Sequence, residues 1–484
     1  MNSFVNTYAN LPKEFYFPFQ PDKVPAPKLI GFNHALSEEL GLGLENTGDN
    51  ELAQIFSGNK LMNGTEPIAL AYAGHQFGQF VPQLGDGRAV LLGEVDTAKG
   101  RFDIQLKGSG ATPFSRRGDG KSPLGPVVRE FLVSEFMHRM DVPTTRALAA
   151  VATGETVHRE RSEPGGVFTR VASSHIRVGT FQYFFARQEV NHLKTLMDYA
   201  IARHYSDIDL KDPERPLLLL KSVLKRQADL IARWMSVGFI HGVMNTDNTS
   251  VAGITLDYGP CAFMDDFDFQ KVFSFIDRNG RYAYNRQPHI MLWNLARLAD
   301  TLLPLMEGDD TRNIKKLEKE LSQFELEFEQ CWRIHFCRKL GLAESKDGEA
   351  MVQSWLKLLS DFKLDYTLSY RYLSEALNND SIPEFFASTG DQGELFIKKW
   401  KSQLEAENVN PYKAAELMNT INPLVIPRNH WIQKVIDEVE QGNVKGFDEF
   451  YEVLKEPFKS RSKDHPMTLP PAVGEQVETT FCGT

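Results

Sequence analysis

The spacing of apolar residues changes once along the chain, and this change limits the fold more than any other feature. Between residues 67 and 172, short runs that favour β-strands are separated by turn clusters. One helical pattern, VVREFLVSEFMHRM, interrupts them after Pro126. After about residue 180 apolar residues recur at helical spacing, as in amphipathic helices. The sequence therefore predicts an α+β protein in which a β-rich part precedes a larger helical part.

The same pattern gives an expected organisation. We expect an N-terminal extension packed on the body (1–60), a β-rich part (61–180), a helical part (181–460) and a polar C-terminal tail carrying Cys482 (461–484). The helical part has one exception at 240–270, where a polar loop precedes two short strand-like pieces, ITLDYG and CAFMDD. A polar loop held between regular elements is a typical place for a functional site.

Composition narrows the classes of function. The chain has 484 residues and a formal net charge of −10, which argues against broad binding to nucleic acids or anionic membranes but leaves room for a local basic pocket. Its four cysteines form no CxxC pair, so neither a disulfide scaffold nor a structural zinc site is expected. We find no signal or transit peptide pattern and no run of about 18 apolar residues. A cytoplasmic protein without a membrane partner is the prediction.

The segment HGVMNTDN, residues 241–248, has the most informative composition. Asn248 and, nine residues later, Asp257 are the residue types that hold Mg²⁺ on phosphate oxygens, and Asp247 adds a further oxygen donor. The alternative is a hairpin loop whose Asn and Asp side chains cap their own backbone.

Lys107 ends the strand-like run DIQLK and could reach a nucleotide phosphate from there. Glu130, in the first turns of the helical pattern after Pro126, could pair with it. The alternatives are a solvated lysine on an edge strand and a glutamate that interacts only with the helix dipole.

Basic residues gather around glycine-rich turns in the β-rich part. Arg88 follows Gly85 and Gly87, Arg116, Arg117 and Lys121 flank Asp119 and Gly120, and Arg170 and Arg177 bracket VASSHI. Arginine forks suit phosphate oxygens, and glycine lets the backbone approach them closely. For any single arginine a surface salt bridge is the simpler interpretation.

The polar loop that starts at His241 and the pair of Lys107 and Glu130 together resemble the protein-kinase-like fold. HG followed by five residues and Asn248, and then the DYG triplet that starts at Asp257, looks like its catalytic and metal loops. Lys107 and Glu130 fall where that fold keeps its strand lysine and helix glutamate. Kinases carry an aspartate directly after the HG-type pair, whereas this chain has Val243. The glycine loop that covers the phosphates in kinases also has a different pattern here.

The strings YAGHQFGQF, QLGDGRAVLLGE, QLKGSGATPFSRRGDG, VPTTRAL, HGVMNTDN and LDYGPCAFMDD are similar to those of the selenoprotein O family, the YdiU-type proteins. This resemblance runs from about residue 8 to the C-terminus. It implies a kinase-like fold with a β-rich N-lobe and a helical C-lobe. It also implies ATP bound end for end relative to kinases, and transfer of AMP to hydroxyl side chains of proteins.

The resemblance assigns expected roles residue by residue. It implies nucleotide contacts at Gly85, Gly87, Arg88, Lys107, Asp119, Gly120, Arg170, Arg177 and Asp257, a lysine partner at Glu130, a catalytic base at Asp247 and metal ligands at Asn248 and Asp257. Because β- and γ-phosphates in a pocket of the N-lobe need several cations, the basic cluster agrees with a reversed nucleotide.

The leading hypothesis is a Mg²⁺-dependent adenylyltransferase that acts on Ser, Thr or Tyr of protein substrates, with UMP transfer from UTP and use of Mn²⁺ as variants. Val243 motivates an alternative from another class, a nucleotide-binding pseudoenzyme that regulates partners. A protein phosphotransferase is the third possibility. We expect a monomer.

Overall fold

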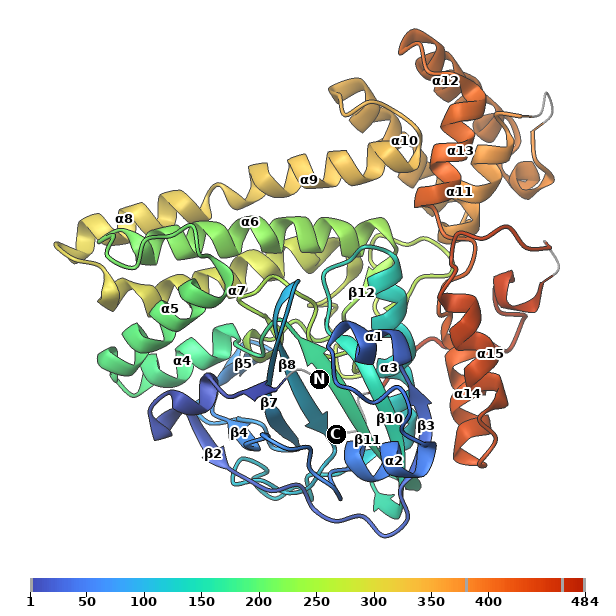
Figure 1. The fold of residues 1–484 in the computed structure, drawn as a ribbon. Helices are drawn as coiled ribbons and strands as arrows, with labels where there is room; N and C mark the ends of the chain where they lie inside the picture. Colours follow the sequence, from blue (N-terminus) through green and yellow to red (C-terminus); the bar gives the residue numbers. More distant parts are fainter. Residues whose placement is uncertain (1–2, 379–381, 463–464, 482–484) are drawn as a thin grey trace.

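The computed structural model describes residues 3–378, 382–462 and 465–481, and confirms the α+β class. Cys482 lies outside these described residues. A large antiparallel sheet fills the lower part of Figure 1, and a layer of long helices lies above it. Further helices stand along the side of the sheet that carries α3 (Leu124–Arg139) and form a group at the upper right.

Within the described residues the main sheet has nine strands. They are β1 (Phe4–Val5), β2 (Tyr16–Pro18), β3 (Lys28–Phe32), β4 (Ile68–Leu70), β7 (Ala89–Thr97), β8 (Gly100–Lys107), β9 (Ser122–Pro123), β10 (Arg146–His158) and β11 (Ser162–Ala172). The order is β2-β4-β7-β8-β11-β10-β3, with β1 beside β7 and β9 beside β11. Two small sheets pair β5 (Gly74–Gln76) with β6 (Gln79–Val81) and β12 (Phe239–Ile240) with β13 (Ala262–Phe263). β8 is therefore central.

The described helices cover both the sheet and one another. They are α1 (His34–Glu39), α2 (Asp49–Phe56), α3, α4 (Val178–Ala186), α5 (Val190–His204), α6 (Arg215–Ser236), α7 (Gln287–Leu302), α8 (Asp310–Leu321), α9 (Phe324–Lys339), α10 (Lys346–Asp361), α11 (Tyr366–Glu375), α12 (Gly390–Ala406), α13 (Pro411–Ile421), α14 (Asn429–Glu440) and α15 (Lys445–Leu454). Helices α6, α7 and α9 run beside one another above the sheet, and α14 and α15 pack near α3 (Figure 1).

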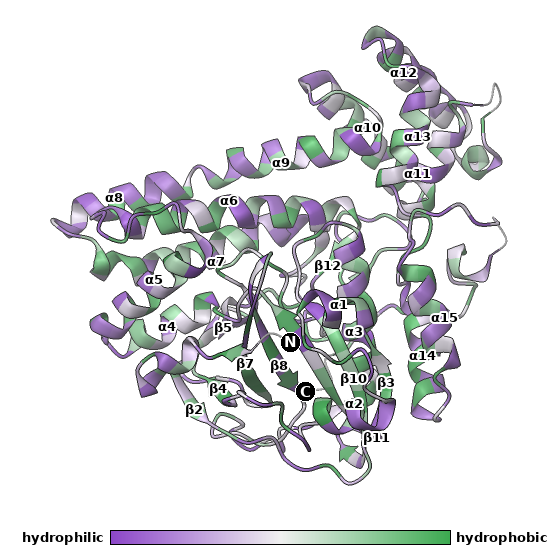
Figure 2. Cartoon of the chain, in the orientation of Figure 1, coloured by the Kyte–Doolittle hydropathy of each residue, from purple (hydrophilic) through white to green (hydrophobic). Residues whose placement is uncertain are grey.

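The alternation of side chains along β8 explains how the sheet divides its two faces. Ile104 and Leu106 are fully buried in a hydrophobic cluster with α1 and α2. Since successive residues of a strand point to opposite faces, Gln105 and Lys107 point to the other face. In Figure 2 the strands of the sheet are mostly green, whereas α8, at the far left, is mostly purple. The polar positions of β8 thus stand out on a largely apolar sheet.

The part expected to be helical from its apolar spacing contains the long helices α6 and α7. Of the two strand-like pieces expected at 240–270, CAFMDD is confirmed, because it contains β13. The predicted strand ITLD is wrong, because Thr255 makes only isolated bridges, to Thr144 and Thr249. Asp257 has a φ of 66°, in the left-handed region, which ends any extended path at this point.

Both ends of the chain contact the rest of the molecule. β1, β2 and β3, within the first 60 residues, are strands of the main sheet. Near the other end, Thr480 donates its backbone N–H to the Phe273 carbonyl at 2.7 Å and its hydroxyl to the Pro260 carbonyl at 2.6 Å. The last described residues therefore lie against the loop that follows Asp257. No helix among the described residues is both long and apolar enough to cross a membrane.

Lys339, at the end of α9, is a buried lysine that gives a prediction about stability. It is 4 % exposed, and its Nζ lies 4.0 Å from the centre of the Tyr370 ring. Burial lowers its pKa to about 7. Between pH values of about 7 and about 10.4, the usual pKa of lysine, this lysine is protonated in the unfolded chain and mostly neutral in the folded chain. The free energy of unfolding therefore rises with pH in this range.

We expect Lys339→Met to unfold at a temperature a few degrees higher than the wild type at pH 7. The substitution keeps the length of the side chain and removes the cost of burying an ammonium group. The difference should shrink as the pH approaches 10, which thermal unfolding at several pH values can measure. Lys315→Met, at an exposed position of α8, is the control. If the unfolding temperature of Lys339→Met at pH 7 is equal to or lower than that of the wild type, burial of this lysine does not destabilise the fold.

Candidate active site

A cavity of about 1110 Å³ lies between the polar face of the sheet and the loop at 241–248. It brings together most of the residues that the sequence singled out. Its lining includes Gly85, Gly87, Arg88, Lys107, Asp119, Gly120, Arg170, Arg177, Asp247, Asn248 and Asp257. Glu130 is the one candidate residue outside this lining, and it reaches the cavity through Lys107. Residues about 170 positions apart in sequence thus face one space, which we call the central cavity.

Lys107 ends β8, at the centre of the sheet, and only 8 % of it is exposed. This excludes the solvated edge-strand lysine. Its Nζ donates to Glu130 Oε2 at 2.6 Å, which confirms the predicted pair, and it also forms an ion pair with Asp257. Lys107 is therefore a buried cation between two carboxylates, one from α3 and one from the loop after β12.

Asp257 combines an unusual backbone with an unusual acidity. Its left-handed conformation, with a φ of 66°, is one that Asp and Asn adopt more readily than most other residues. Burial raises its pKa, but Lys107, Arg170 and Arg88 outweigh burial and hold the pKa well below its usual range. The carboxylate is thus ionised at any physiological pH, as a ligand for cations must be.

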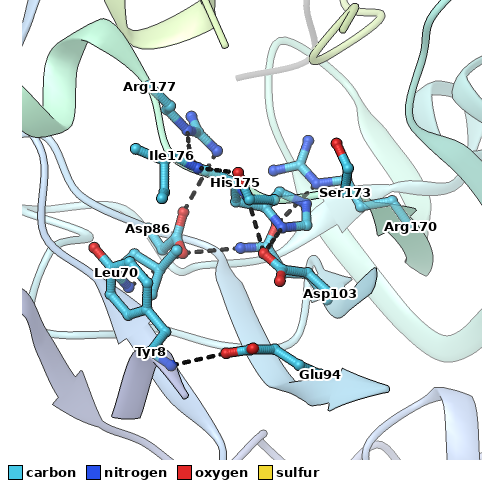
Figure 3. A network of polar contacts seen from close by, with 12 residues as sticks. Tyr8, Leu70, Asp86, Glu94, Asp103, Arg170, Ser173, His175, Ile176 and Arg177 are labelled. Atoms are coloured by element: carbon cyan, nitrogen blue, oxygen red, sulfur yellow. Dashed lines mark hydrogen bonds and ion pairs between the residues drawn. The ribbon is translucent and has the colours of Figure 1, made fainter. Parts of the chain in front are cut away.

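Arg170 and Arg177 are buried, at 3 % and 5 % exposure, so the surface salt bridge interpretation is wrong for both. Arg170 donates from Nε to Gln105 Oε1 at 2.8 Å, and Gln105 Nε2 donates to Asp86 Oδ2 at 2.9 Å. Arg177 Nη2 lies 3.8 Å from the other oxygen of Asp86 (Figure 3). The two arginines are therefore linked through the buried pair Gln105 and Asp86, which fixes where both cations point.

Sequence reasoning missed Gln105 and Asp86 as site residues. A signal was present for Gln105, because alternation along DIQLK places Asp103, Gln105 and Lys107 on one face of a strand. Asp86 lies between the two glycines of the turn LGDGR. A polar residue at every second position of a central strand is costly to bury unless it is paired, and so indicates a buried network.

Further polar contacts, some of which are drawn in Figure 3, connect the N-terminal segment to this region. Tyr8 donates its backbone N–H to Glu94 Oε1 at 2.8 Å, and Arg203 Nη1 donates to Glu94 Oε2 at 2.8 Å. Arg203 also pairs with Asp103, whose Oδ2 accepts from His175 Nδ1 at 2.9 Å. Burial lowers the pKa of His175 to about 4, so this histidine is neutral. The network anchors the chain just before Arg177.

Asp247 lies in a single 3-10 turn, Thr246–Asn248, and is 8 % exposed. Arg177 Nη1 donates to its backbone carbonyl at 2.9 Å, and His75 donates its backbone N–H to Thr246 Oγ1 at 2.7 Å. These two hydrogen bonds hold the turn in place from both sides. Burial raises the pKa of Asp247 to about 6, although Arg177 opposes this rise. Its Oδ1 is buried without a hydrogen-bond partner among the described residues. Asp247 is among the residues that line the central cavity, and a buried carboxylate with this raised pKa can accept a proton.

Asn248 has its amide oriented by the loop itself. Its Nδ2 donates to the Val243 carbonyl at 3.0 Å, which leaves Oδ1 free of that contact and able to act as an oxygen ligand. Val243 faces the central cavity at the position where kinases carry an aspartate. No group of three or more His, Cys, Asp and Glu side chains in the described ranges is arranged to hold a metal ion.

The glycine-rich turns form the opposite wall of the central cavity. Gly120 has a φ of 68°, and a Cβ there would lie 2.0 Å from the Gly110 carbonyl oxygen. Gly85 has a φ of 66°, and a Cβ there would lie 2.3 Å from the Phe114 ring. Only glycine fits either position, because a side chain would meet the Gly110 backbone or the Phe114 ring. Asp119 accepts hydrogen bonds from both Arg159 Nη atoms, at 2.8 and 2.9 Å, and these bonds lower its pKa to about 2.

The remaining basic residues differ in their placement. Arg88 is half-buried in the lining of the central cavity and is one of the cations that lower the pKa of Asp257. Arg116 and Arg117 are exposed at the mouth. Lys121 pairs with Glu155. The basic side chains of the cavity therefore differ in exposure, since some are buried beside β8 and others are exposed at the rim.

Comparison with known proteins identifies the family of the chain. A family model described as "Protein adenylyltransferase SelO" matches residues 1–455. The chain belongs to the SelO family. It is 50 % identical over 491 residues, the full length of both chains, to "Protein nucleotidyltransferase YdiU" of Agrobacterium fabrum (strain C58). It is 50 % identical over 488 residues to the protein of that name from Rhodopseudomonas palustris (strain BisB18), and 49 % identical over 488 residues to that from Rhizobium meliloti (strain 1021), with 99 % of both chains covered in each case.

Membership of SelO gives the enzyme class. This SelO chain is a nucleotidyltransferase of the protein adenylyltransferase family, as the resemblance noted in the sequence implied. The central cavity contains the cations and carboxylates that such chemistry requires, on the sheet and on the loop at 241–248. The match extends well beyond these motifs and includes the first 60 residues.

Proposed function

We propose that the chain transfers AMP from ATP to Ser, Thr or Tyr hydroxyls of proteins and releases pyrophosphate. The observation that supports this best is that one cavity is lined both by the buried cations Lys107, Arg170 and Arg177 and by the buried carboxylate residue Asp247. Cations stabilise a polyphosphate leaving group, and a free carboxylate accepts the proton of the attacking hydroxyl.

The positions of these groups support a nucleotide that lies with its β- and γ-phosphates over the sheet. Arg170 and Arg177 are held by Gln105 and Asp86, and such prearranged cations need little reorganisation as charge develops on the leaving pyrophosphate. Gly85, Gly87 and Gly120 line the central cavity, and a backbone without side chains lets phosphate oxygens come close to it. Arg88 and Asp119 complete the proposed nucleotide contacts.

Asp247 is the proposed catalytic base. The acceptor hydroxyl attacks the α-phosphorus, the bond from that phosphorus to the bridging oxygen of the β-phosphate breaks, and the hydroxyl proton moves to Asp247. A pKa of about 6 suits a base that is ionised near neutral pH and still binds a proton well. Val243 supplies no such group, so Asp247 takes the role that this position has in kinases.

Asn248 and Asp257 fit a divalent cation, Mg²⁺ or Mn²⁺. Asp257 is held ionised, and Asn248 has its amide nitrogen bonded so that its oxygen is available. When bound, the cation would neutralise negative charge on the phosphates. Lys107, paired with Glu130 and Asp257, holds the Asp257 carboxylate in place beside Asn248 in the lining of the cavity.

Several finer expectations belong to this proposal. The sheet with its central lysine, followed by the helical part, supports a kinase-like arrangement of two lobes. The boundaries at 60, 180 and 460 stay predictions, and β1, β2 and β3 from the first 60 residues are strands of the main sheet. Use of UTP as a second donor also belongs to it. The cytoplasmic location and the monomeric state stay predictions.

Labelled ATP tests the proposed function. With protein acceptors and Mg²⁺, label from the α-phosphate should appear on protein and label from the γ-phosphate should not. The opposite pattern would establish a phosphotransferase. Transfer of neither label, together with measurable ATP binding, would favour the nucleotide-binding pseudoenzyme.

Replacing Asp247 by Asn should lower α-label transfer by roughly 10² to 10³, because the amide cannot accept the hydroxyl proton. ATP affinity should stay within about threefold of the wild type, since the shape of the side chain is kept and Arg177 binds only its backbone carbonyl. Transfer kinetics and a separate binding titration measure the two effects. Asp207→Asn, outside the lining of the central cavity, is the control. Unchanged transfer would remove Asp247 from the reaction.

A further inference from the structure

A second cavity, of about 670 Å³, adjoins the central cavity and shares one lining residue with it, Phe77. Its lining includes Arg281, Arg286, His289 and Trp293 and contains no Asp or Glu. We call it the basic groove. A concentration of positive charge is notable here because the whole chain has a net charge of −10.

The guanidinium groups of Arg281 and Arg286 form no ion pair in the described part of the chain, and the Asp277 carboxylate accepts only the backbone N–H of Arg281, at 2.8 Å. Arg286 is exposed and forms no ion pair with a described carboxylate, and the same holds for Arg281. Nε of Arg281 is buried without a hydrogen-bond partner among the described residues. Arg297 provides the contrast, since it lies over the same Trp293 ring but pairs with Asp300 at 3.2 Å. The cations of the groove are thus left available for an external anion.

Aromatic rings hold these cations in place. The guanidinium carbon of Arg281 lies 5.0 Å from the centre of the Trp293 ring and 5.7 Å from that of Tyr282. Phe77 is 37 % exposed and contacts Tyr282 with ring centres 5.5 Å apart. Such rings orient an arginine by cation–π attraction and offer apolar surface to the backbone and side chains of a bound segment.

The basic groove is tied directly to the loop that carries the proposed base. Asn245 Oδ1 accepts from the Phe77 backbone N–H at 3.0 Å and from the Tyr282 hydroxyl at 2.8 Å. Phe77 has a φ of 53°, so these bonds hold it in a conformation that is rare for a bulky residue. Asn245 is two residues before Asp247, and a chain lying in the groove would therefore enter the central cavity beside Asp247.

From this geometry we propose that the basic groove binds an acidic segment of the protein substrate, next to the hydroxyl that receives the nucleotide. This inference rests on the proposed function for the identity of the acceptor, and adds its sequence preference. Carboxylates of the segment pair with Arg281 and Arg286, and the charge complementarity selects acceptor sites with Asp or Glu close to the target residue.

Binding of two synthetic peptides tests the proposal without any catalytic step. Both are fluorescently labelled, equally long and carry one central tyrosine, flanked by Glu in one and by Lys in the other. The full-length chain should bind the Glu peptide at least about tenfold more tightly at low salt, and added salt should reduce this preference. Arg286→Glu should abolish or reverse the preference, whereas Arg312→Glu, at an exposed position of α8, should leave it unchanged.

Equal binding of the two peptides, or a preference that survives Arg286→Glu, would overturn the proposal. Tighter binding of a short single-stranded RNA than of the Glu peptide, with the same loss in Arg286→Glu, would assign the groove to a nucleic acid instead. The proposed function is judged separately, by α-label transfer to any protein acceptor. If the chain transfers AMP but does not prefer the Glu peptide, only the proposed role of the basic groove is refuted. If the chain prefers the Glu peptide but transfers no label, only the proposed AMP transfer is refuted.

Discussion

Replacing Asp257 by Asn should lower the transfer of AMP by about 10³ or more while the protein stays folded. Asn keeps the size of the side chain and tolerates the left-handed backbone at this position, where the φ is 66°. What it removes is the negative charge that pairs with Lys107 and that would bind a divalent cation. Charge stabilisation of this kind contributes several kcal/mol to transition states.

Transfer of α-label from ATP and a thermal unfolding curve together test this expectation. Asp268→Asn is a matched control, because Asp268 is exposed and follows the same loop. It should leave transfer unchanged. If Asp257→Asn loses less than about tenfold with its unfolding midpoint unchanged, the negative charge at this position has no role in the reaction.

Lys107→Ala has the second large expected effect, a loss of about 10³ in kcat/KM together with weaker ATP binding. The substitution removes a prearranged ammonium group from the centre of the sheet, where it would contact phosphate. It also leaves Glu130 buried without its closest partner. Removing one member of a buried ion pair costs about 3–5 kcal/mol, but Arg170 remains 3.5 Å from Glu130 and offsets part of this loss. The fold should therefore persist at lower stability.

Lys99→Ala is the matched control for Lys107→Ala. Lys99 lies in the turn between β7 and β8, its side chain is 69 % exposed, and its ion pair with Glu39 is at the surface. Surface pairs contribute little, so this variant should keep both activity and stability. An ATP affinity for Lys107→Ala equal to that of the wild type, in a protein shown to be folded, would place Lys107 outside the nucleotide site.

Much of the site could be predicted because its motifs are local in sequence. The loop at 241–248 and the turns around Gly85 and Gly120 show their residue types directly, and the structure places them around one cavity. The pair of Lys107 and Glu130 could be predicted because a strand lysine and a glutamate in the following helix face each other when that helix packs on the sheet. The α+β class followed from the change in apolar spacing, and the structure confirms it.

The features that were missed depend on contacts between segments far apart in the chain. Gln105 and Asp86 are linked to the arginines across neighbouring strands, and the register of strands cannot be read from composition. The wrong strand at ITLD has a cause of another kind, since Asp257 adopts a left-handed conformation that its residue type alone does not reveal. The basic groove was not predicted because Phe77 and Arg281 are about 200 positions apart.

In the proposed reaction the buried cations of the sheet receive the leaving pyrophosphate while Asp247 faces the α-phosphate. A structure of the chain with Mg²⁺ and an ATP analogue that cannot be cleaved between the α- and β-phosphates tests it most directly. We expect β- and γ-phosphate oxygens within hydrogen-bond distance of Lys107, Arg170 or Arg177, and the α-phosphate nearest to Asp247. A γ-phosphate directed at Asp247, with the α-phosphate against the arginines, would contradict it.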